Sequence, residues 1–489
     1  MTDEPAKASG ASYVPASGPW RRGARDGGAG VGVGSVLVAV VIATVAGAWA
    51  GGSRVPVGGI AGLALCVAAL ARGKARATLL VAGIAFAAAG WRSGVEWAAV
   101  RSPRIGPVAA NSRIVSDPDP VGGALVVVLE VEGQRFEAWT HGSPARRLRG
   151  ALAGETVWIE GVRRAGPGGG WLASRHVVGR IELVRVGVRG PGPPLHRAVN
   201  RVRGLLQRGA RPLGEDERSL FAGLVYGDDR HQSAELVAAF RASGLAHLSA
   251  VSGQNVGFLL AAAGPVLRRL APWPRWLVTV GLLACFATLT RFEPSVLRAV
   301  VMAGLGATAF VSGRDRSAAR LLALAVVALV LVDPLLAWSV GWWMSVTAAL
   351  GLSLLAAPLA GLLPGPQWLT APLAVTLAAQ LGVLPVTLVV FGWPPAVALP
   401  ANLLAVPVAG AVMLTGIPAA LVGANLPDGF AAWLLWLPGM GVRWVATVAR
   451  LAARVPASPL DVAVWIGVPL ALVRRTRGRA AAALRDPSA

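Results

Sequence analysis

The sequence predicts an α-helical polytopic membrane protein with a small β-barrel domain inserted between its membrane segments. Three observations favour this fold class. Hydrophobic residues make up 55% of the 489 residues and charged residues 14%, and the mean hydropathy is +0.60, a composition outside the usual range of soluble proteins. Apolar runs of about 20 residues, the length that crosses a bilayer, recur along the chain. Between residues 101 and 189 these runs stop, and apolar residues alternate with polar ones instead.

The charge and cysteine content exclude some classes of site. The formal net charge of +22 comes almost entirely from arginine, since only Lys7 and Lys74 are lysines among the 46 basic residues. Abundant Ala, Gly, Val and Pro accompany this arginine, as is typical of a GC-rich coding sequence, so arginine alone does not indicate a ligand. Cys66 and Cys285 each lie in an apolar run, which argues against a disulfide framework or a thiolate metal site. We expect no metal and no cofactor.

The N-terminal part predicts a tail followed by three membrane helices. Residues 1–30 are polar, and no small-residue cleavage pattern follows a short apolar core, so we expect a disordered cytoplasmic tail and no cleaved signal peptide. Residues 31–97 predict a three-helix membrane segment, with spans at 31–50, 55–71 and 77–97. Basic residues precede the first span and separate the second from the third, which the positive-inside rule places in the cytoplasm: Arg21, Arg22, Arg25, Arg72, Lys74 and Arg76.

Residues 101–189 predict a β domain outside the cytoplasm, because the third span exits there. The segment ALVVVLEVEGQRFEAWT predicts two strands joined at Glu132-Gly133, and ETVWIEGVRR alternates in the same way. With WLASRHVV and RIELVRV, about five short strands favour a small closed barrel similar to an OB-fold. A long loop of this kind crosses the membrane regardless of its charge.

The rest of the chain predicts interfacial helices and then further spans. Residues 196–242 are amphipathic, which favours helices that lie in the membrane interface. Residues 243–473 contain nine apolar runs, for a total of about twelve spans: 245–270, 276–290, 295–312, 318–332, 338–357, 371–391, 397–422, 430–449 and 460–473. Pro407 and Pro418 leave open whether the tenth span is two half-helices. Residues 474–489 form a basic tail, and both termini are predicted to be cytoplasmic.

Four segments of the second half, in their order and spacing, carry a resemblance to a known family. They are LVYGDDRHQSAELVAAFRASGLAHLSAVSGQNVGFLLAA, TRFEPSVLRAVVMAGL, VDPLLAWSVGWWMSVTAALGLSLLAAPL and AAQLGVLPVTLVVFGWPPAVALPANLLAVPV. Together they resemble the ComEC family, the membrane channels for DNA import in natural competence, over about residues 220–473. The preceding helices and β domain are also similar to the N-terminal half of the family. The resemblance implies a surface DNA receptor, a cytoplasmic ATPase and a separate nuclease as partners.

The sequence departs from the family at two points. Many relatives carry a C-terminal metallo-β-lactamase-like domain with an H-x-H-x-D-H run, whereas the five histidines here are scattered singly, so we expect no such nuclease centre. The β domain also lacks the cysteine pair that forms a disulfide in some relatives. No G-x-x-x-x-G-K-[ST] run occurs either, so the force for import is expected to come from a partner.

The segment GLAHLSAVSGQNVGFLLAAAG begins with polar residues and continues as an apolar helix. The resemblance assigns its polar part to the lining of a DNA conduit: His247, Ser252, Gly253, Gln254 and Asn255. In this interpretation Gly253 lets a broken helix bend, and irregular backbone at membrane depth is tolerated only where it is buried in protein or faces water. One alternative is a helix start capped by polar groups and bent at Ser252-Gly253. Another is a hydrolase in which Ser252 is the nucleophile, His247 the base and Asp228 or Asp229 the third member, although the G-x-S-x-G pattern is absent.

Four more residues are predicted to line the conduit. Arg291 and Arg298 lie in or beside a span, where ionisable groups usually face a bundle interior or an aqueous cavity, although a paired Arg and Glu293 that fixes packing is the alternative. Gln380 and Asn402 lie in apolar sequence, where each amide should bond across helices. Helix packing is the alternative role for both.

The β domain combines aromatic and basic residues in a way that favours contact with single-stranded DNA, because bases stack on aromatic rings and arginines attract phosphates. The predicted contacts are Arg135, Trp139, Arg146, Arg147, Trp158, Arg163 and Arg164. The alternative is that these tryptophans, with Trp171, form the core of the barrel.

These observations predict a multi-pass cell-membrane channel, not an enzyme, that imports a single strand of transforming DNA. Its expected partners are single-stranded DNA and membrane lipid, together with the competence proteins above; the oligomeric state is not predicted. A secondary transporter, which should show internal repeats, and a membrane-embedded hydrolase are the rival functions.

Overall fold

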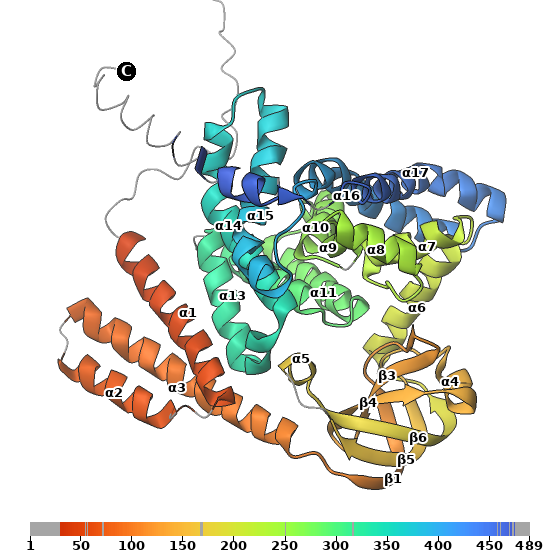
Figure 1. Ribbon diagram of the computed structural model, residues 1–489, viewed down its shortest axis with the longest axis horizontal. Helices are drawn as coiled ribbons and strands as arrows, with labels where there is room; N and C mark the ends of the chain where they lie inside the picture. Colours follow the sequence, from red (N-terminus) through yellow and green to blue (C-terminus); the bar gives the residue numbers. More distant parts are fainter. Residues whose placement is uncertain are drawn as a thin grey trace, which may run out of the picture.

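The computed structural model describes residues 30–474 except positions 54, 56, 71–72, 167–169, 250, 315–316, 457, 460, 469 and 472–473. Within these residues the protein is mostly helical, with one small sheet domain that lies beneath α6 (Figure 1). The predicted tails, residues 1–30 and 474–489, lie outside the described residues apart from Gly30 and Arg474.

The three N-terminal helices lie where the sequence predicts spans. They are α1 (Gly30–Gly52), α2 (Val57–Leu70) and α3 (Gly73–Arg101). α1 packs along α3, and Ser93 on α3 donates its hydroxyl to the Ala48 carbonyl of α1 at 2.6 Å. A polar side chain between apolar helices is thereby satisfied by backbone, as an environment without water requires.

The β domain contains six strands and two short helices. The elements are β1 (Gly106–Ile114), β2 (Asp119–Val121), β3 (Ala124–Val131), β4 (Gln134–Thr140), α4 (Gly142–Leu148), β5 (Thr156–Ala165), α5 (Gly170–Ala173) and β6 (Val177–Gly190). The predicted hairpin at Glu132-Gly133 joins β3 to β4, and both turn residues have positive φ, 49° and 81°, as a tight two-residue hairpin turn requires. Phe136, Leu129 and Ile159 are fully buried inside the sheet.

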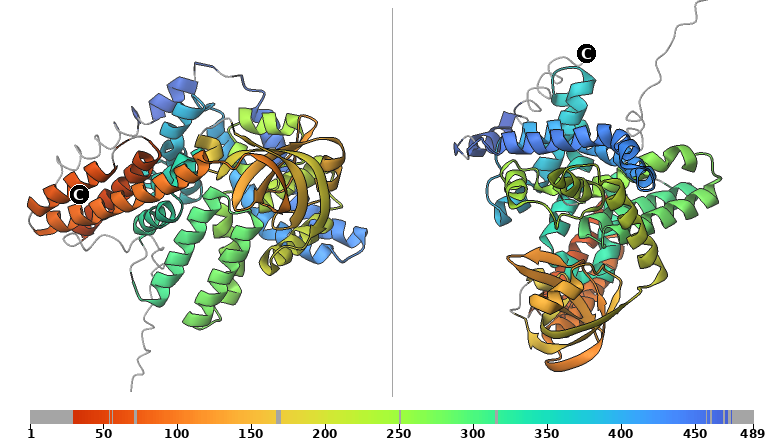
Figure 2. Two further views of the ribbon diagram at one scale, coloured as in Figure 1. Left: turned by 90° about the horizontal axis from the view of Figure 1, so that it is seen from below. Right: turned by 90° about the vertical axis from the view of Figure 1, so that its right-hand side faces the viewer.

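The sheet is not the closed barrel that the sequence predicts. Its strand order is β1-β5-β6-β4-β3-β2, antiparallel except for the β4–β6 pair. The sheet curls (Figure 2), yet β1 meets β3 at only two residue pairs, Arg113 with Glu130 and Ile114 with Leu129. β1 ends at Ile114, and the backbone N–H groups of Val115 and Ser116 still donate to the Val128 carbonyl of β3, at 2.8 and 3.4 Å, before the chain reaches Asp117. The Asp117 carboxylate is held among arginines from the helical part.

Three helices follow where one amphipathic stretch is predicted. They are α6 (Pro194–Gly209), α7 (Glu215–Tyr226) and α8 (Ala234–Ala242). Their apolar faces form a core with α16 (Ala398–Gly423) and α17 (Asp428–Ala452). One charged residue, Arg203, lies on the buried face of α6 between Val199 and Leu206.

The remaining helices coincide with predicted spans. They are α9 (Ala246–Ser249), α10 (Gly253–Leu267), α11 (Pro272–Leu289), α12 (Pro294–Val311), α13 (Ala318–Val332), the 3-10 helix η1 (Pro334–Trp338), α14 (Val340–Leu362) and α15 (Gln367–Val390), followed by α16 and α17. α16 is one continuous helix, so Pro407 and Pro418 do not divide it. The predicted span at 460–473 lies partly outside the described residues.

Six helices in the described part of the chain are long and apolar enough to cross a membrane, judged by length and composition. They are α3, α12, α14, α15, α16 and residues 35–52 of α1. α10 and α13 are shorter apolar helices of 15 residues each. These helices are consistent with a membrane protein that crosses the bilayer several times.

Candidate polar site at a broken helix

The polar residues before α10 lie where a helix is interrupted. α9 ends at Ser249 and α10 begins at Gly253, which confirms the predicted bend at Ser252-Gly253. Ser252 has extended backbone at the N-cap position, but its side chain makes no capping bond and donates to Asn255 Oδ1 at 3.4 Å. Asn255 Nδ2 donates to the Leu224 carbonyl of α7 at 3.0 Å. Asn255 therefore ties the start of α10 to α7.

Arg298 on α12 is buried directly behind this break, with 8% of its surface exposed. Its guanidinium donates to Ser345 Oγ of α14 at 2.9 Å and contacts Met302 Sδ at 3.0 Å. A Cβ atom on Gly253 would lie 2.6 Å from Arg298 Nη2 and 3.1 Å from the Ala299 Cβ, so a larger residue at that position requires the guanidinium to shift. Among the described residues no acidic side chain pairs with Arg298. A buried cation with neutral partners alone is costly, which makes this place a candidate functional site.

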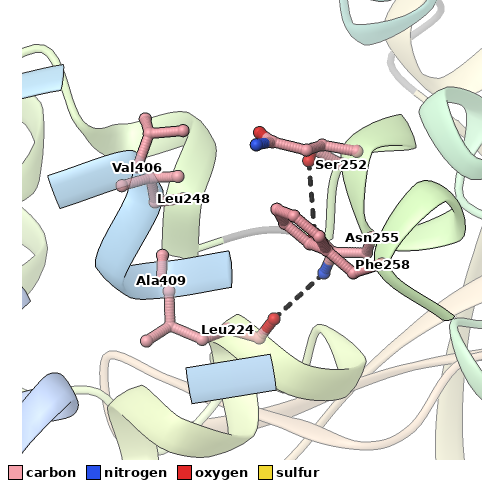
Figure 3. A pocket seen from close by; sticks show the side chains of 8 residues that line it. Leu224, Leu248, Ser252, Asn255, Phe258, Val406 and Ala409 are labelled. Atoms are coloured by element: carbon pink, nitrogen blue, oxygen red, sulfur yellow. Dashed lines mark hydrogen bonds between the residues drawn. The ribbon is translucent and has the colours of Figure 1, made fainter. Parts of the chain in front are cut away.

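A small cavity adjoins the break. Its volume is about 10 Å³, room for about one water molecule. Figure 3 shows Ser252 and Asn255 on one side and Val406 and Ala409 of α16 on the other. Leu224, Leu248, Gln254 and Phe258 complete the lining. The polar atoms thus come from the start of α10 and the rest of the wall is apolar.

Gln380 and Asn402, also predicted to line a conduit, lie elsewhere. Gln380 Nε2 on α15 and Asn402 Nδ2 on α16 both donate to the Ala398 carbonyl, at 3.3 and 2.7 Å. Asn402 is buried, at 4% exposed. The Gln380 bond joins α15 to the start of α16, which fits the packing role that the sequence left open, whereas the Asn402 bond lies within α16 and does not cross between helices as expected.

Arg291 belongs to a buried ion cluster that joins the β domain to the helices, not to the polar break. We define the ion cluster as Asp117, Arg203, Asp228, Arg230 and Arg291. Arg291 forms two bonds with the Asp117 carboxylate, at 2.8 and 3.0 Å. Arg203 Nη2 lies 3.0 Å from Asp117 and 2.8 Å from Asp228. Arg230 also forms two bonds with Asp228, at 2.7 and 2.6 Å.

The ion cluster comes from four separate parts of the chain. Asp117 follows β1, Arg203 lies on α6, Asp228 and Arg230 follow α7, and Arg291 lies in the turn between α11 and α12. Arg230 Nη1 also donates to the Pro118 carbonyl at 3.0 Å. Sequence reasoning missed Asp117 and Arg203, although an arginine on the apolar stripe of α6 is a signal of a buried charge pair.

The arginines keep both aspartates ionised. Burial raises the pKa of Asp228, but hydrogen bonds and attraction from Arg230, together with Arg203, lower that pKa to about 2. Burial likewise raises the pKa of Asp117, and the attraction of Arg203, Arg291 and Arg230 more than offsets it, so its pKa lies below the usual range.

A Ser-His-Asp arrangement gains no support from these contacts. Asp228, one proposed third member, is held by two arginines, and the hydroxyl of Ser252 is directed at Asn255. His247 is exposed on α9. Among the described residues no hydrogen bond joins Ser252 to His247, the proposed base.

In the β domain the tryptophans are on the outside. Trp139, Trp158 and Trp171 are 43%, 37% and 62% exposed, so the alternative that they form the core is wrong. Phe136 and aliphatic side chains fill the core instead.

The predicted DNA-contacting arginines differ in how much of their charge is offset. Arg163 pairs with Glu132 at 2.7 Å and Arg164 with Glu182 at 2.8 Å. Arg135 donates to the Arg175 carbonyl at 3.3 Å and lies 3.8 Å from Glu130. Arg146 and Arg147 are exposed on α4 and make no ion pair with any described residue. Arg147 Nη1 donates to the Val186 carbonyl at 2.9 Å, so among the predicted DNA-contacting arginines Arg146 carries the charge that is most available to an anion.

The fold and the site define a class of protein: a mostly helical protein with several apolar helices consistent with membrane spans, a β domain, and a half-buried polar break between its helices. Within that class the chain belongs to the Competence protein family, whose sequence profile matches residues 224–474, and this confirms the resemblance to the ComEC family. The match includes Leu224, the break before α10 and Arg298; the β domain lies before it.

Two curated proteins are similar to the chain. ComE operon protein 3 of Bacillus subtilis (strain 168) is 28% identical over 236 residues, which cover 48% of this chain and 30% of that protein. The uncharacterized protein YcaI of Escherichia coli (strain K12) is 28% identical over 221 residues, 42% of this chain and 29% of that protein. The chain thus covers less than a third of the length of these relatives. No solved structure matches it.

Proposed function

We propose that this protein forms the passage through which one strand of DNA crosses the cell membrane during natural competence. The observation that carries the proposal is Arg298, a buried guanidinium with neutral partners beside an interrupted helix. A phosphate of the strand would supply the anion that this cation lacks. Membership of the competence family supports the same conclusion.

In this proposal the passage opens by movement of α10. The cavity at the break has a volume of only about 10 Å³, whereas a polyanion needs a hydrated path through about 30 Å of hydrocarbon. The hydrogen bond from Asn255 to Leu224 and the packing of Phe258 against Gly410 close the cavity towards α7 and α16. Separation of α10 from these two helices would join the break to a larger aqueous path.

The β domain would receive the strand outside the cytoplasm, in about a twelve-span topology with cytoplasmic termini. Its exposed Trp139 and Trp158 offer stacking surfaces for bases, and Arg146 and Arg147 offer charge to phosphates. The OB-like character of the domain and its DNA contacts are part of the proposal. So are the partners: a surface DNA receptor, a separate nuclease and a cytoplasmic ATPase that pulls the strand. The protein itself acts as a channel and not as an enzyme.

Substitution of Arg298 tests the proposal. In a naturally competent host whose own homologue is deleted and replaced by this chain, Arg298→Gln should lower uptake of labelled DNA into the cytoplasm at least about tenfold, the effect of losing one charge-assisted contact. Arg298→Lys should retain part of the uptake. DNA binding at the cell surface should stay constant.

The matched control is Arg443→Gln, which removes an arginine from an exposed ion pair with Glu217 on the outside of α17. Cells that carry this variant should take up labelled DNA at the wild-type level. Wild-type uptake by the Arg298→Gln variant, with the protein present in the membrane at normal amount, would show that no strand passes this arginine.

A further inference from the structure

A groove of about 510 Å³ lies between α10, α11 and α12, separate from the cavity at the break. Small residues of α12, namely Ala303, Gly306 and Ala307, line one wall, and Leu260 and Leu267 of α10 line another. Ala303 and Val311 both line the groove, and eight residues of helix between them correspond to about 12 Å along the axis. The volume falls within the range of sites that bind small molecules.

One end of the groove is basic. Arg268, just after α10, and Arg275, in the first turn of α11, both line it, and no acidic residue does. Arg268 folds back over Gly264, with Nη1 3.9 Å from the place of a Cβ atom there. Arg275 lies over the Phe310 ring, 4.7 Å from its centroid. In the described part of the chain neither arginine forms an ion pair with an acidic side chain. Two positive charges at this end of the groove are therefore available to bind an anion.

The walls favour a lipid over a nucleotide. A nucleotide base needs a free aromatic face or groups that bond its edge. Trp276 donates Nε1 to Thr308 Oγ1 at 3.0 Å and makes an edge contact with Trp273, and Phe310 is covered by Arg275. Apart from Arg268, Arg275, Trp276 and Thr279, the lining of the groove is apolar, which suits an acyl chain.

We propose that this groove, with Arg268 and Arg275 at one end, binds one anionic phospholipid of the surrounding bilayer. The headgroup phosphate lies between Arg268 and Arg275, and an acyl chain follows α12 towards Ala303. The two arginines lie on the side that the positive-inside rule assigns to the cytoplasm, where basic pockets between membrane helices bind acidic headgroups. The inference stands independently of the DNA passage, because the groove and the break share no lining residue.

Native mass spectrometry of the purified full-length chain tests this inference. Wild-type protein released from micelles that contain equal amounts of phosphatidylglycerol and phosphatidylcholine of one chain length should retain one phosphatidylglycerol with at least about tenfold preference, since charged contacts contribute more than one factor of ten. The double variant Arg268→Gln/Arg275→Gln should lose that preference. Arg269→Gln, the adjacent exposed arginine that does not line the groove, is the matched control and should behave as wild type.

Two further measurements distinguish a bound phospholipid from a small soluble phosphate. Ala307→Leu narrows the groove while both arginines remain, and it should weaken retention of phosphatidylglycerol if an acyl chain enters. Glycerol 3-phosphate, which has the headgroup charge but no acyl chain, should not displace the lipid. Equal retention of both lipids by wild type, full retention by the double variant, or displacement by glycerol 3-phosphate would each overturn the proposal.

Discussion

Arg298 and Gly253 depend on each other at the residue scale. The guanidinium occupies the volume that a side chain at position 253 would need, and it is held there by Ser345 rather than by an acid. A neutral hydroxyl leaves the positive charge in place, so the cost of burying the charge is only partly offset. Binding of an anion at this site would therefore offset the remaining free-energy cost of the buried charge.

Gly253→Ala and Gly257→Ala should therefore have opposite effects. A Cβ on Gly253 meets Arg298 at 2.6 Å, whereas a Cβ on Gly257, one turn further along α10, meets nothing within 4 Å. We expect Gly253→Ala to destabilise the protein by about 1–3 kcal/mol and to reduce DNA uptake. Gly257→Ala should be neutral or stabilising by up to about 1 kcal/mol, because alanine favours helix. Thermal unfolding in detergent measures both, and equal stability of the two variants would show that Arg298 simply moves aside.

At the scale of elements, α10 is too short to cross the membrane alone. Its 15 residues correspond to about 22 Å, against about 30 Å of hydrocarbon. The break and the single turn of α9 directly precede it in the chain. Arg268 and Arg269 directly follow the C-terminal end of α10, and the polar residues of the break lie at its N-terminal end. The two ends of the helix therefore have different chemical surroundings.

A reversible crosslink between α7 and α10 should stop import if α10 has to move. Leu224→Cys and Asn255→Cys, made after Cys66 and Cys285 are replaced by alanine, put thiols on two residues that line the same cavity and are joined by a hydrogen bond from the Asn255 side chain to the Leu224 backbone carbonyl. When a short methanethiosulfonate linker joins the two thiols, the variant should lose DNA uptake almost completely, and a reducing agent should restore the uptake. Each single cysteine variant treated with the same linker is the control. Full uptake with complete crosslinking would mean that α7 and α10 stay together during transport.

The sequence predicted the positions of most helices and of the β3–β4 hairpin, because these elements depend on residues that are close together in the chain. The apolar runs located α12, α13 and α16, and the turn residues located the β3–β4 hairpin. The continuity of α16 could not be decided from Pro407 and Pro418, since neighbouring helices determine whether a freed carbonyl is tolerated. The predicted closure of the sheet was wrong as well, because closure depends on how far β1 pairs with β3, and alternation within each strand does not determine that pairing.

On the scale of the whole molecule, the ion cluster connects the β domain to the helices. Arg291 and Asp117 are 174 residues apart in sequence, and no local pattern joins them. Both Arg291 and Arg298 were predicted as conduit lining from their position in or beside a span, and only the structure shows that Arg291 lies in the ion cluster and Arg298 against Gly253. Removal of one member of a buried pair leaves an uncompensated charge, which typically costs about 3–5 kcal/mol. The cluster therefore holds the β domain over the helical part.

The stability of this connection should fall in acid. The pKa of Asp228 is about 2 in the folded protein, below the ordinary value of 3.8. A group with a lowered folded pKa stabilises the fold above its unfolded pKa and loses that effect as pH falls through the folded value. We expect about 2 kcal/mol of stabilisation to be present at pH 7 and lost between about pH 4 and pH 2, with roughly half lost by pH 3. The midpoint of thermal unfolding in detergent measures this change.

Asp117→Asn and Asp428→Asn give that experiment its comparison. Asp117→Asn removes a buried carboxylate between Arg203 and Arg291 and should already lower the unfolding midpoint at pH 7. Asp428→Asn removes a carboxylate that is 80% exposed and pairs with Arg211 at 3.4 Å, so it should leave the midpoint unchanged and keep the wild-type acid dependence. If wild type and Asp117→Asn unfold at the same temperature at pH 7, the attraction among these five side chains does not hold the β domain, and the apolar contacts of α6 alone fix its position.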